Sequence, residues 1–136
     1  MKVYLVARYS RFKECQHVRD DLNLLGHTVT SRWIAGDCEL TRDGSREASN
    51  GERAVYAQQD MEDLLAADCV IVFTEEPRKT NTRGGRHVEF GVALALKKRV
   101  IVIGWRENVF HCLPHCEFFH TWPAAARILD NEARVS

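Results

Sequence analysis

The amino-acid sequence predicts an α/β fold of the flavodoxin-like type: a doubly wound, five-stranded parallel sheet with strand order 2-1-3-4-5 and helices on both faces. Two observations carry this prediction. Short, continuous apolar segments recur along the chain, as in strands that are buried on both faces. Strand and helix segments alternate five times, and right-handed crossovers make this strand order the simplest one. The 136 residues have the length of one domain, which we expect to span residues 1–136.

The N-terminal part of the chain supplies the first strand, the first helix and the second strand. Residues 2–7, KVYLVA, form the first apolar segment. Ser10 is expected to cap a helix over residues 11–25, whose apolar positions recur at helical spacing. Gly26 stands where a left-handed residue often ends a helix. Residues 27–33, HTVTSRW, are expected to form the second strand.

The middle of the chain contains a loop of unusual length. Residues 34–51 lack periodicity and are rich in Gly and Ser, and loops this long in compact domains are usually functional or mobile. A helix is expected over residues 52–67, and CVIVFT, residues 69–74, is expected to form the third strand. A basic loop over residues 75–86 then leads to a helix over residues 88–97.

The C-terminal part completes the alternation. RVIVIG, residues 99–104, is expected to form the fourth strand, and a fifth is expected near Phe118. Thr121 is expected to cap a last helix that has Pro123 in its first turn and runs to about residue 131. In such a fold, ligands bind at the carboxyl ends of the strands, near the switch point between the first and third strands.

The charge balance argues against binding to a nucleic-acid polymer. The 19 Lys and Arg residues equal the 19 Asp and Glu residues, whereas nucleic-acid binders usually carry a basic excess. No apolar segment approaches the roughly 18 to 20 residues that span a bilayer, and no signal segment is recognisable. We therefore expect a cytoplasmic protein without a membrane partner, whose five Cys residues are reduced.

Glu89 is the most informative carboxylate in the sequence. It follows Gly84 and Gly85, and it is expected in the first turn of the helix after the third strand. The glycines allow a ligand to approach the backbone closely, and a helix N-terminus offers free N–H groups that favour an ionised carboxylate. A nucleophilic Glu needs this environment. A first-turn Glu without a function is equally compatible with the position.

Basic residues flank the glycine pair. Arg83 and Arg86, with Arg78 and Lys79 upstream, could hold a phosphate group together with nearby threonines, and a solvated basic loop is the alternative. The segment matches neither the P-loop nor the dinucleotide fingerprint.

Other candidate residues lie near the expected strand ends. Arg8 and Tyr9 follow the first strand and Trp33 ends the second, so a planar base could stack on either aromatic ring. Core packing of both rings is the alternative. Asp60, taken alone, fits a solvated face of the second helix, because acidic residues lie beside it.

The segment HCLPHC, residues 111–116, contains residue types that bind zinc. It is one short stretch without a second Cys or His pair at recognisable spacing, so we favour a loop and expect no metal. A zinc-stabilised interaction module remains an alternative, which metal analysis of the purified protein would test.

Three segments resemble the nucleoside 2-deoxyribosyltransferase superfamily, which includes the 2′-deoxynucleoside 5′-monophosphate N-hydrolases. They are VYLVARYSR, DMEDLLAADCVIV and GGRHVEFGVALALKKRVIVIG, and the similarity spans roughly residues 1–104. The resemblance implies that Glu89 is the nucleophile and Asp60 its acidic partner. It also implies a homodimer or larger oligomer, in which a neighbouring subunit's residues 108–113, beginning with Asn108, would help to close each site. The family often has Asp or Ser where this chain has Arg83 and Gly84.

The resemblance implies cleavage of the N-glycosidic bond of a nucleoside or nucleoside 5′-monophosphate through a glycosyl ester on Glu89. Water as acceptor would make the enzyme an N-glycosidase, and a second base would make it a transferase. The basic loop favours a 5′-monophosphate, and no cofactor is implied. A non-catalytic domain of the same fold that binds or senses nucleotides is the alternative.

Overall fold

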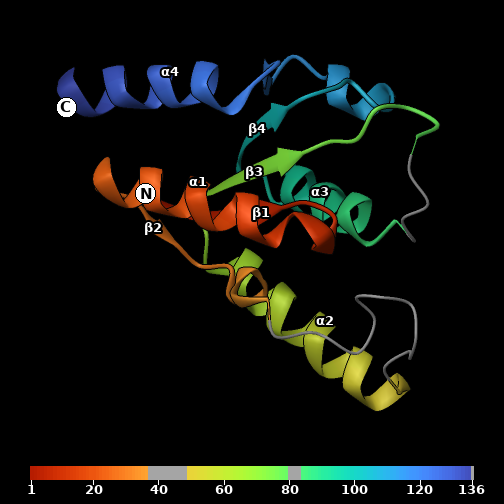
Figure 1. Cartoon of the computed structure of the whole chain (residues 1–136). Helices are drawn as coiled ribbons and strands as arrows, with labels where there is room; N and C mark the ends of the chain where they lie inside the picture. Colours follow the sequence, from red (N-terminus) through yellow and green to blue (C-terminus); the bar gives the residue numbers. More distant parts are fainter. Residues whose placement is uncertain (37–48, 80–83, 136) are drawn as a thin grey trace.

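The computed structural model describes residues 1–36, 49–79 and 84–135. Its centre is a five-stranded, fully parallel sheet with strand order 2-1-3-4-5 (Figure 1). This confirms the predicted fold class. The strands are β1 (Lys2–Val6), β2 (Thr28–Val29), β3 (Cys69–Phe73), β4 (Arg99–Ile103) and β5 (Cys116–Phe119).

Helices cover both faces of the sheet (Figure 1). Side chains of α1 and α4 pack on one face and side chains of α2 and α3 pack on the other. In the described part of the chain the α-helices are α1 (Phe12–Leu24), α2 (Asn50–Leu65), α3 (Gly85–Ala95) and α4 (Trp122–Val135). Within the described ranges, no helix is long and apolar enough to cross a membrane.

Successive residues of β1 point to opposite faces, as in any strand. Leu5 packs in the core layer on the side of α1 and α4, whereas Tyr4 and Val6 pack in the layer on the side of α2 and α3. Tyr4 is fully buried. This alternation places the phenol of Tyr4 under α3, the helix that carries Glu89.

Two predictions about the N-terminal part are wrong in detail. Ser10 does not cap a helix, because its hydroxyl accepts a hydrogen bond from Arg8 within a 3-10 helix, Tyr9–Arg11, that precedes α1. The second strand is two residues long instead of seven. Beyond it, both the backbone N–H and the side chain of Arg32 bond to Asp63 on α2, and the chain turns into a 3-10 helix, Arg32–Ala35.

Other helix boundaries shift by a few residues. A capping box between Ser49 and Glu52 starts α2 two residues earlier than predicted. The next helix, α3, begins at Gly85, so Glu89 is its fifth residue and lies beyond the first turn. The predictions for Gly26, which has φ +89, and for the Thr121 cap are confirmed.

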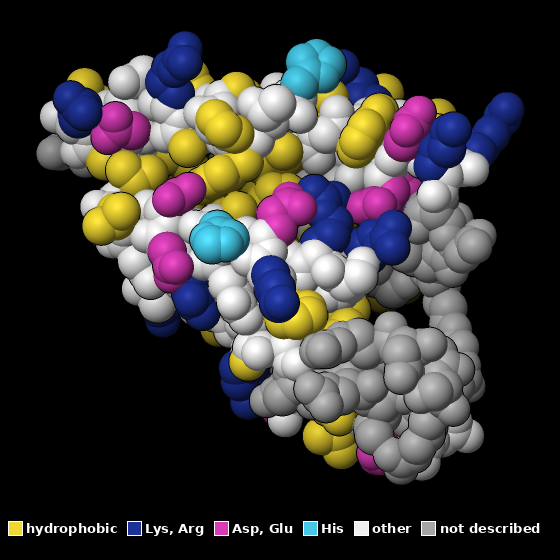
Figure 2. All heavy atoms as spheres, viewed as in Figure 1, with side chains coloured by type: hydrophobic (Ala, Val, Ile, Leu, Met, Phe, Trp, Pro, Cys, Tyr) yellow, Lys and Arg dark blue, Asp and Glu magenta, His cyan; other side chains and the backbone are white. Residues whose placement is uncertain are grey.

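Basic and acidic side chains are interspersed on the face of the molecule that Figure 2 shows. This pattern agrees with the equal numbers of basic and acidic residues in the sequence.

Candidate active site

A cavity of about 630 Å³ lies where the chain leaves β1, beside α2 and α3. Four residues singled out from the sequence line it: Tyr9, Trp33, Asp60 and Glu89. They come from four separate segments, which the fold brings together at the carboxyl end of β1. The volume lies within the range of roughly 300 to 1,000 Å³ that small-molecule sites usually have.

Glu89 is held in this cavity by Tyr4, whose phenol donates a hydrogen bond to Oε2 of the carboxyl group. Burial raises the pKa of Glu89 to about 7, the hydrogen bond from Tyr4 partly opposes this, and the nearby Asp60 adds to it. The expectation that the helix N-terminus would favour the ionised form is therefore wrong. Glu89 lies past the first turn, and the cost of burying a charge dominates.

Asp60 is the second half-buried carboxyl group of the cavity. Burial raises its pKa to about 6, and Asp63 adds to the rise while Arg32 opposes it. The alternative of a solvated helix-face acid is therefore wrong. Two interacting carboxyl groups that titrate near neutral pH are a typical arrangement for acid–base and nucleophilic chemistry.

Tyr4 is a site residue although it lies within the apolar segment KVYLVA, where core packing is the favoured role. It is buried in the middle of β1, and burial together with the charge of Glu89 raises the pKa of its phenol far above the ordinary value. The phenol therefore keeps its proton and donates to Glu89. The strand period of two could have placed Tyr4 on the face of α3, but the sequence does not show which residue of α3 lies above it.

Aromatic rings form one side of the cavity. The indole N–H of Trp33 donates to the backbone oxygen of Leu5 at 2.8 Å, which fixes the plane of the ring. The ring of Tyr9 lies 6.4 Å from that of Trp33 and stacks on Phe12 at 5.5 Å. The arrangement presents aromatic surface to a planar ligand.

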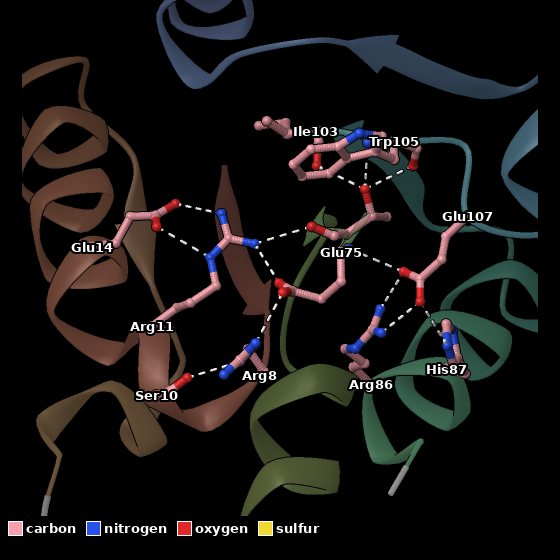
Figure 3. A network of polar contacts seen from close by, with 11 residues as sticks. Arg8, Ser10, Arg11, Glu14, Glu75, Arg86, His87, Ile103, Trp105 and Glu107 are labelled. Atoms are coloured by element: carbon pink, nitrogen blue, oxygen red, sulfur yellow. Dashed lines mark hydrogen bonds and ion pairs between the residues drawn. The ribbon is translucent and has the colours of Figure 1, made fainter. Parts of the chain in front are cut away.

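The structure places Arg8 and Arg86 in a polar network outside the lining of this cavity (Figure 3). Arg8 bonds to Glu75 at 3.2 Å, and Arg11 bonds to the other oxygen of Glu75 at 2.8 Å. Arg86 is buried and forms two hydrogen bonds with Glu107, of 2.5 and 2.6 Å.

The remaining candidates are distributed as follows. Gly84, with φ +88, caps α3, and Gly85 is its first residue, so both glycines serve the start of the helix. Asn108 caps the 3-10 helix Val109–Cys112 and does not line the cavity. Arg83 lies outside the described residues.

The histidine- and cysteine-rich segment is part of the packing. His111 is buried and stacks on Phe90 at 4.5 Å, its Nδ1 accepts the backbone N–H of Asn108, and Cys116 begins β5. Burial lowers the pKa of His111 to about 4, so its ring is neutral. Among the described residues, no group of three or more His, Cys, Asp or Glu side chains could hold a metal ion.

The buried carboxyl group of Glu89 makes stability depend on pH. Its pKa is about 7 in the folded state against an ordinary 4.5, so the folded state binds the proton more tightly. Protonated Glu89 therefore adds to the free energy of unfolding. This contribution is fully present below the ordinary pKa of 4.5, and it is lost as the pH rises through about 7. Glu89→Gln avoids this loss, and we expect it to raise the free energy of unfolding by ~2 kcal/mol at alkaline pH.

Urea unfolding of wild type and Glu89→Gln at mildly acidic and alkaline pH measures this difference. The gap between the two proteins should narrow as the pH falls toward the ordinary pKa of Glu. An equal gap at both pH values would show that Glu89 is ionised throughout.

Comparison with known proteins leads to the same fold. No family model and no curated protein matches the sequence. A 2-deoxyribosyltransferase of Bacillus psychrosaccharolyticus superimposes with a TM-score of 0.64 at 20% identity, covering 93% of this chain and 90% of the other. A CMP N-glycosidase of Clostridium botulinum superimposes with a TM-score of 0.59 at 19% identity, covering 97% and 99%. A conserved protein of Enterococcus faecalis superimposes with a TM-score of 0.54 at 15% identity, covering 97% and 87%. The resemblance drawn from the three sequence segments is thus confirmed at the level of the fold.

Proposed function

We propose that the protein cleaves the N-glycosidic bond of a nucleoside or nucleoside 5′-monophosphate in the cavity that Glu89 lines. One observation carries the proposal: the carboxyl group of Glu89, held by Tyr4, shares this cavity with Asp60. The fold adds support, because similar structures include a 2-deoxyribosyltransferase and a CMP N-glycosidase.

The reaction follows the logic of a retaining glycosidase. The ionised carboxylate of Glu89 attacks C1′ of the sugar, and the C1′–N bond breaks with its electron pair going to the base. Asp60 supplies the proton that the departing base needs. Water or a second base then attacks C1′ of the resulting ester, the Asp60 carboxylate takes up the proton that the attacking group loses, and the C1′–O bond breaks to free the Glu89 carboxylate. Attack by water releases the sugar, and attack by a second base forms a new nucleoside.

The hydrogen bond from Tyr4 to Glu89 has a defined role in this reaction. It holds one oxygen of Glu89 and stabilises the negative charge that the free carboxylate carries before attack and regains after the ester breaks. The aromatic surface of Trp33 and Tyr9 is the place where the base would stack.

The titration of the two carboxyl groups predicts a narrow pH optimum. Turnover needs Glu89 ionised and Asp60 protonated, so kcat/KM should fall on the acid side and on the alkaline side of the interval between about 6 and about 7. When the two carboxyl groups hold one proton between them, that proton is mostly on Glu89, because the pKa of Asp60 is lower. The active form, with the proton on Asp60, is therefore the minor form. It is a constant fraction of the singly protonated enzyme, so it has the same pH dependence.

Asp60→Asn should lower kcat by roughly 10²-fold and abolish the alkaline limb, because no proton remains to be lost from that position. The measurement is kcat/KM from pH 4.5 to 9 for both proteins. An alkaline limb that survives in Asp60→Asn would remove Asp60 from the role of acid.

The function itself is tested by incubating the protein with a panel of nucleosides and 5′-monophosphates and separating the products by chromatography. Each reaction is run with and without a second free base, and Glu89→Gln serves as the inactive control. Free base that appears only with wild type supports the proposal, and a new nucleoside formed with the added base identifies a transferase. Binding of nucleotides without release of base from any of them would instead favour a nucleotide-sensing domain.

A further inference from the structure

The ion pair between Arg86 and Glu107 connects α3 to the carboxyl end of β4. Arg86 lies in the first turn of α3, three residues before Glu89, and Glu107 lies in the chain that follows β4. The two guanidinium NH2 groups each donate to a different oxygen of Glu107, at 2.5 and 2.6 Å. Only 3% of the Arg86 side chain and 10% of the Glu107 side chain are exposed, so water competes little with this pair.

Glu107 is itself fixed from two further directions (Figure 3). The backbone N–H of Glu75, at the end of β3, donates to Oε1 at 3.0 Å, and Nε2 of His87 lies 3.5 Å from Oε2. Burial would raise the pKa of Glu107, but the hydrogen bonds from Arg86 and Glu75 lower it below its ordinary value. The carboxylate is therefore ionised at neutral pH, and it ties the first turn of α3 to the carboxyl ends of β3 and β4.

Among the residues that the structure describes, fewer groups hold Glu89 than hold Glu107. The hydrogen bond that it accepts there comes from Tyr4 on β1, and Asp60 on α2 acts on it through its charge. The geometry of this contact depends on where α3 lies above β1. Arg86 fixes that position close to the helix start through its two hydrogen bonds to Glu107, and further along the helix Phe90 and Ala93 pack in the apolar layer on this face of the sheet.

We propose that Arg86 and Glu107 are positioning residues whose ion pair fixes the start of α3 and so holds Glu89 against Tyr4 in the geometry of attack. The proposal rests on the proposed function, because it assigns the pair a role in turnover at Glu89. A small displacement of a reacting group is costly in such a site: about 1 Å can lower the rate about 10²-fold.

Glu107→Gln tests the proposal, because the amide keeps the size of the side chain but can accept only one of the two hydrogen bonds from Arg86. We expect kcat to fall at least about tenfold with KM changed less than about threefold. Loosening of α3 admits water to Glu89, and since burial is the main cause of its raised pKa, the pKa of Glu89 should fall below about 7. Both limbs of the kcat/KM profile should then move to lower pH, because the two carboxyl groups titrate as a pair. Titration of the ¹³C-labelled Glu89 carboxyl by NMR, without substrate, should show the same shift.

Glu117→Gln is the matched control. It weakens the ion pair of Glu117 with Arg99, which also has two hydrogen bonds, of 2.7 and 2.9 Å. Arg99 is the first residue of β4, so this pair lies away from the carboxyl end of the strand, where Glu107 lies. Glu117→Gln should leave kcat, both limbs of the profile and the Glu89 titration unchanged. Glu107→Asp is the second test variant, because it keeps the charge beside Arg86 and shortens only the reach of the carboxylate.

The outcomes separate this proposal from the proposed function. If wild type releases no base, the proposed function fails, and the NMR titration still tests whether the pair holds Glu89. If Glu107→Gln does not fold, Glu107→Asp decides. The proposal is overturned if the folded variants keep the wild-type Glu89 titration, whether or not their kcat falls, because a purely structural loss would not move that pKa.

Discussion

Glu89→Gln should lower kcat at least about 10³-fold on every substrate that the wild type cleaves, while nucleotides continue to bind. The amide cannot attack C1′, so no glycosyl ester forms. It nearly matches the carboxyl group in shape, and its oxygen can still accept the hydrogen bond from Tyr4. The loss should therefore fall on the chemical step, with a small change in the dissociation constant of the nucleotide.

Glu76→Gln is the matched control, because Glu76 is exposed in the loop after β3 and undergoes the same chemical change. It should keep wild-type kcat. The measurement is the initial rate of base release together with nucleotide binding by calorimetry for all three proteins. Activity in Glu89→Gln within tenfold of wild type would mean that another group attacks the sugar.

Glu107→Ala should lower the free energy of unfolding by about 3 to 5 kcal/mol. The change leaves the guanidinium of Arg86 buried without its counter-charge, and it also removes the acceptor of the Glu75 backbone N–H. A loss of this size is a large part of the total stability of a small domain. Urea unfolding at neutral pH, followed by circular dichroism, measures it.

The double substitution of Arg86→Met with Glu107→Leu is the control for this effect. It removes both charges and fills the space with apolar groups, so it should recover much of the stability that Glu107→Ala loses. A double variant as unstable as Glu107→Ala would show that the cost arises from lost packing and hydrogen bonds and not from the unpaired guanidinium.

The fold was predictable because its signals are local. The buried strands appear in the sequence as apolar segments such as KVYLVA and RVIVIG. Gly26 ends a helix through its left-handed backbone conformation, and the side chain of Thr121 caps the start of another. The errors have tertiary causes. The second strand is short because Arg32 bonds to Asp63, a residue 31 positions away that no local pattern connects to it.

The candidate site was predictable only in part. Residue types and the family resemblance selected Glu89 and Asp60, and the position of strand ends selected Tyr9 and Trp33, all of which line one cavity. The protonation state of Glu89 was not predictable, because it depends on burial in the assembled fold. Arg86 is a similar case: its partner Glu107 lies 21 residues away in the loop after β4.

The stereochemistry of the reaction distinguishes a covalent ester on Glu89 from a single direct displacement at C1′. Wild type would be supplied with a substrate that it cleaves and with methanol as a competing acceptor, and the configuration of the methyl glycoside at C1′ would be read by NMR. Two successive displacements, with an ester on Glu89 between them, return the β configuration of the nucleoside. We expect the β product alone. An α product would show a single direct displacement, and it would contradict a covalent role for Glu89.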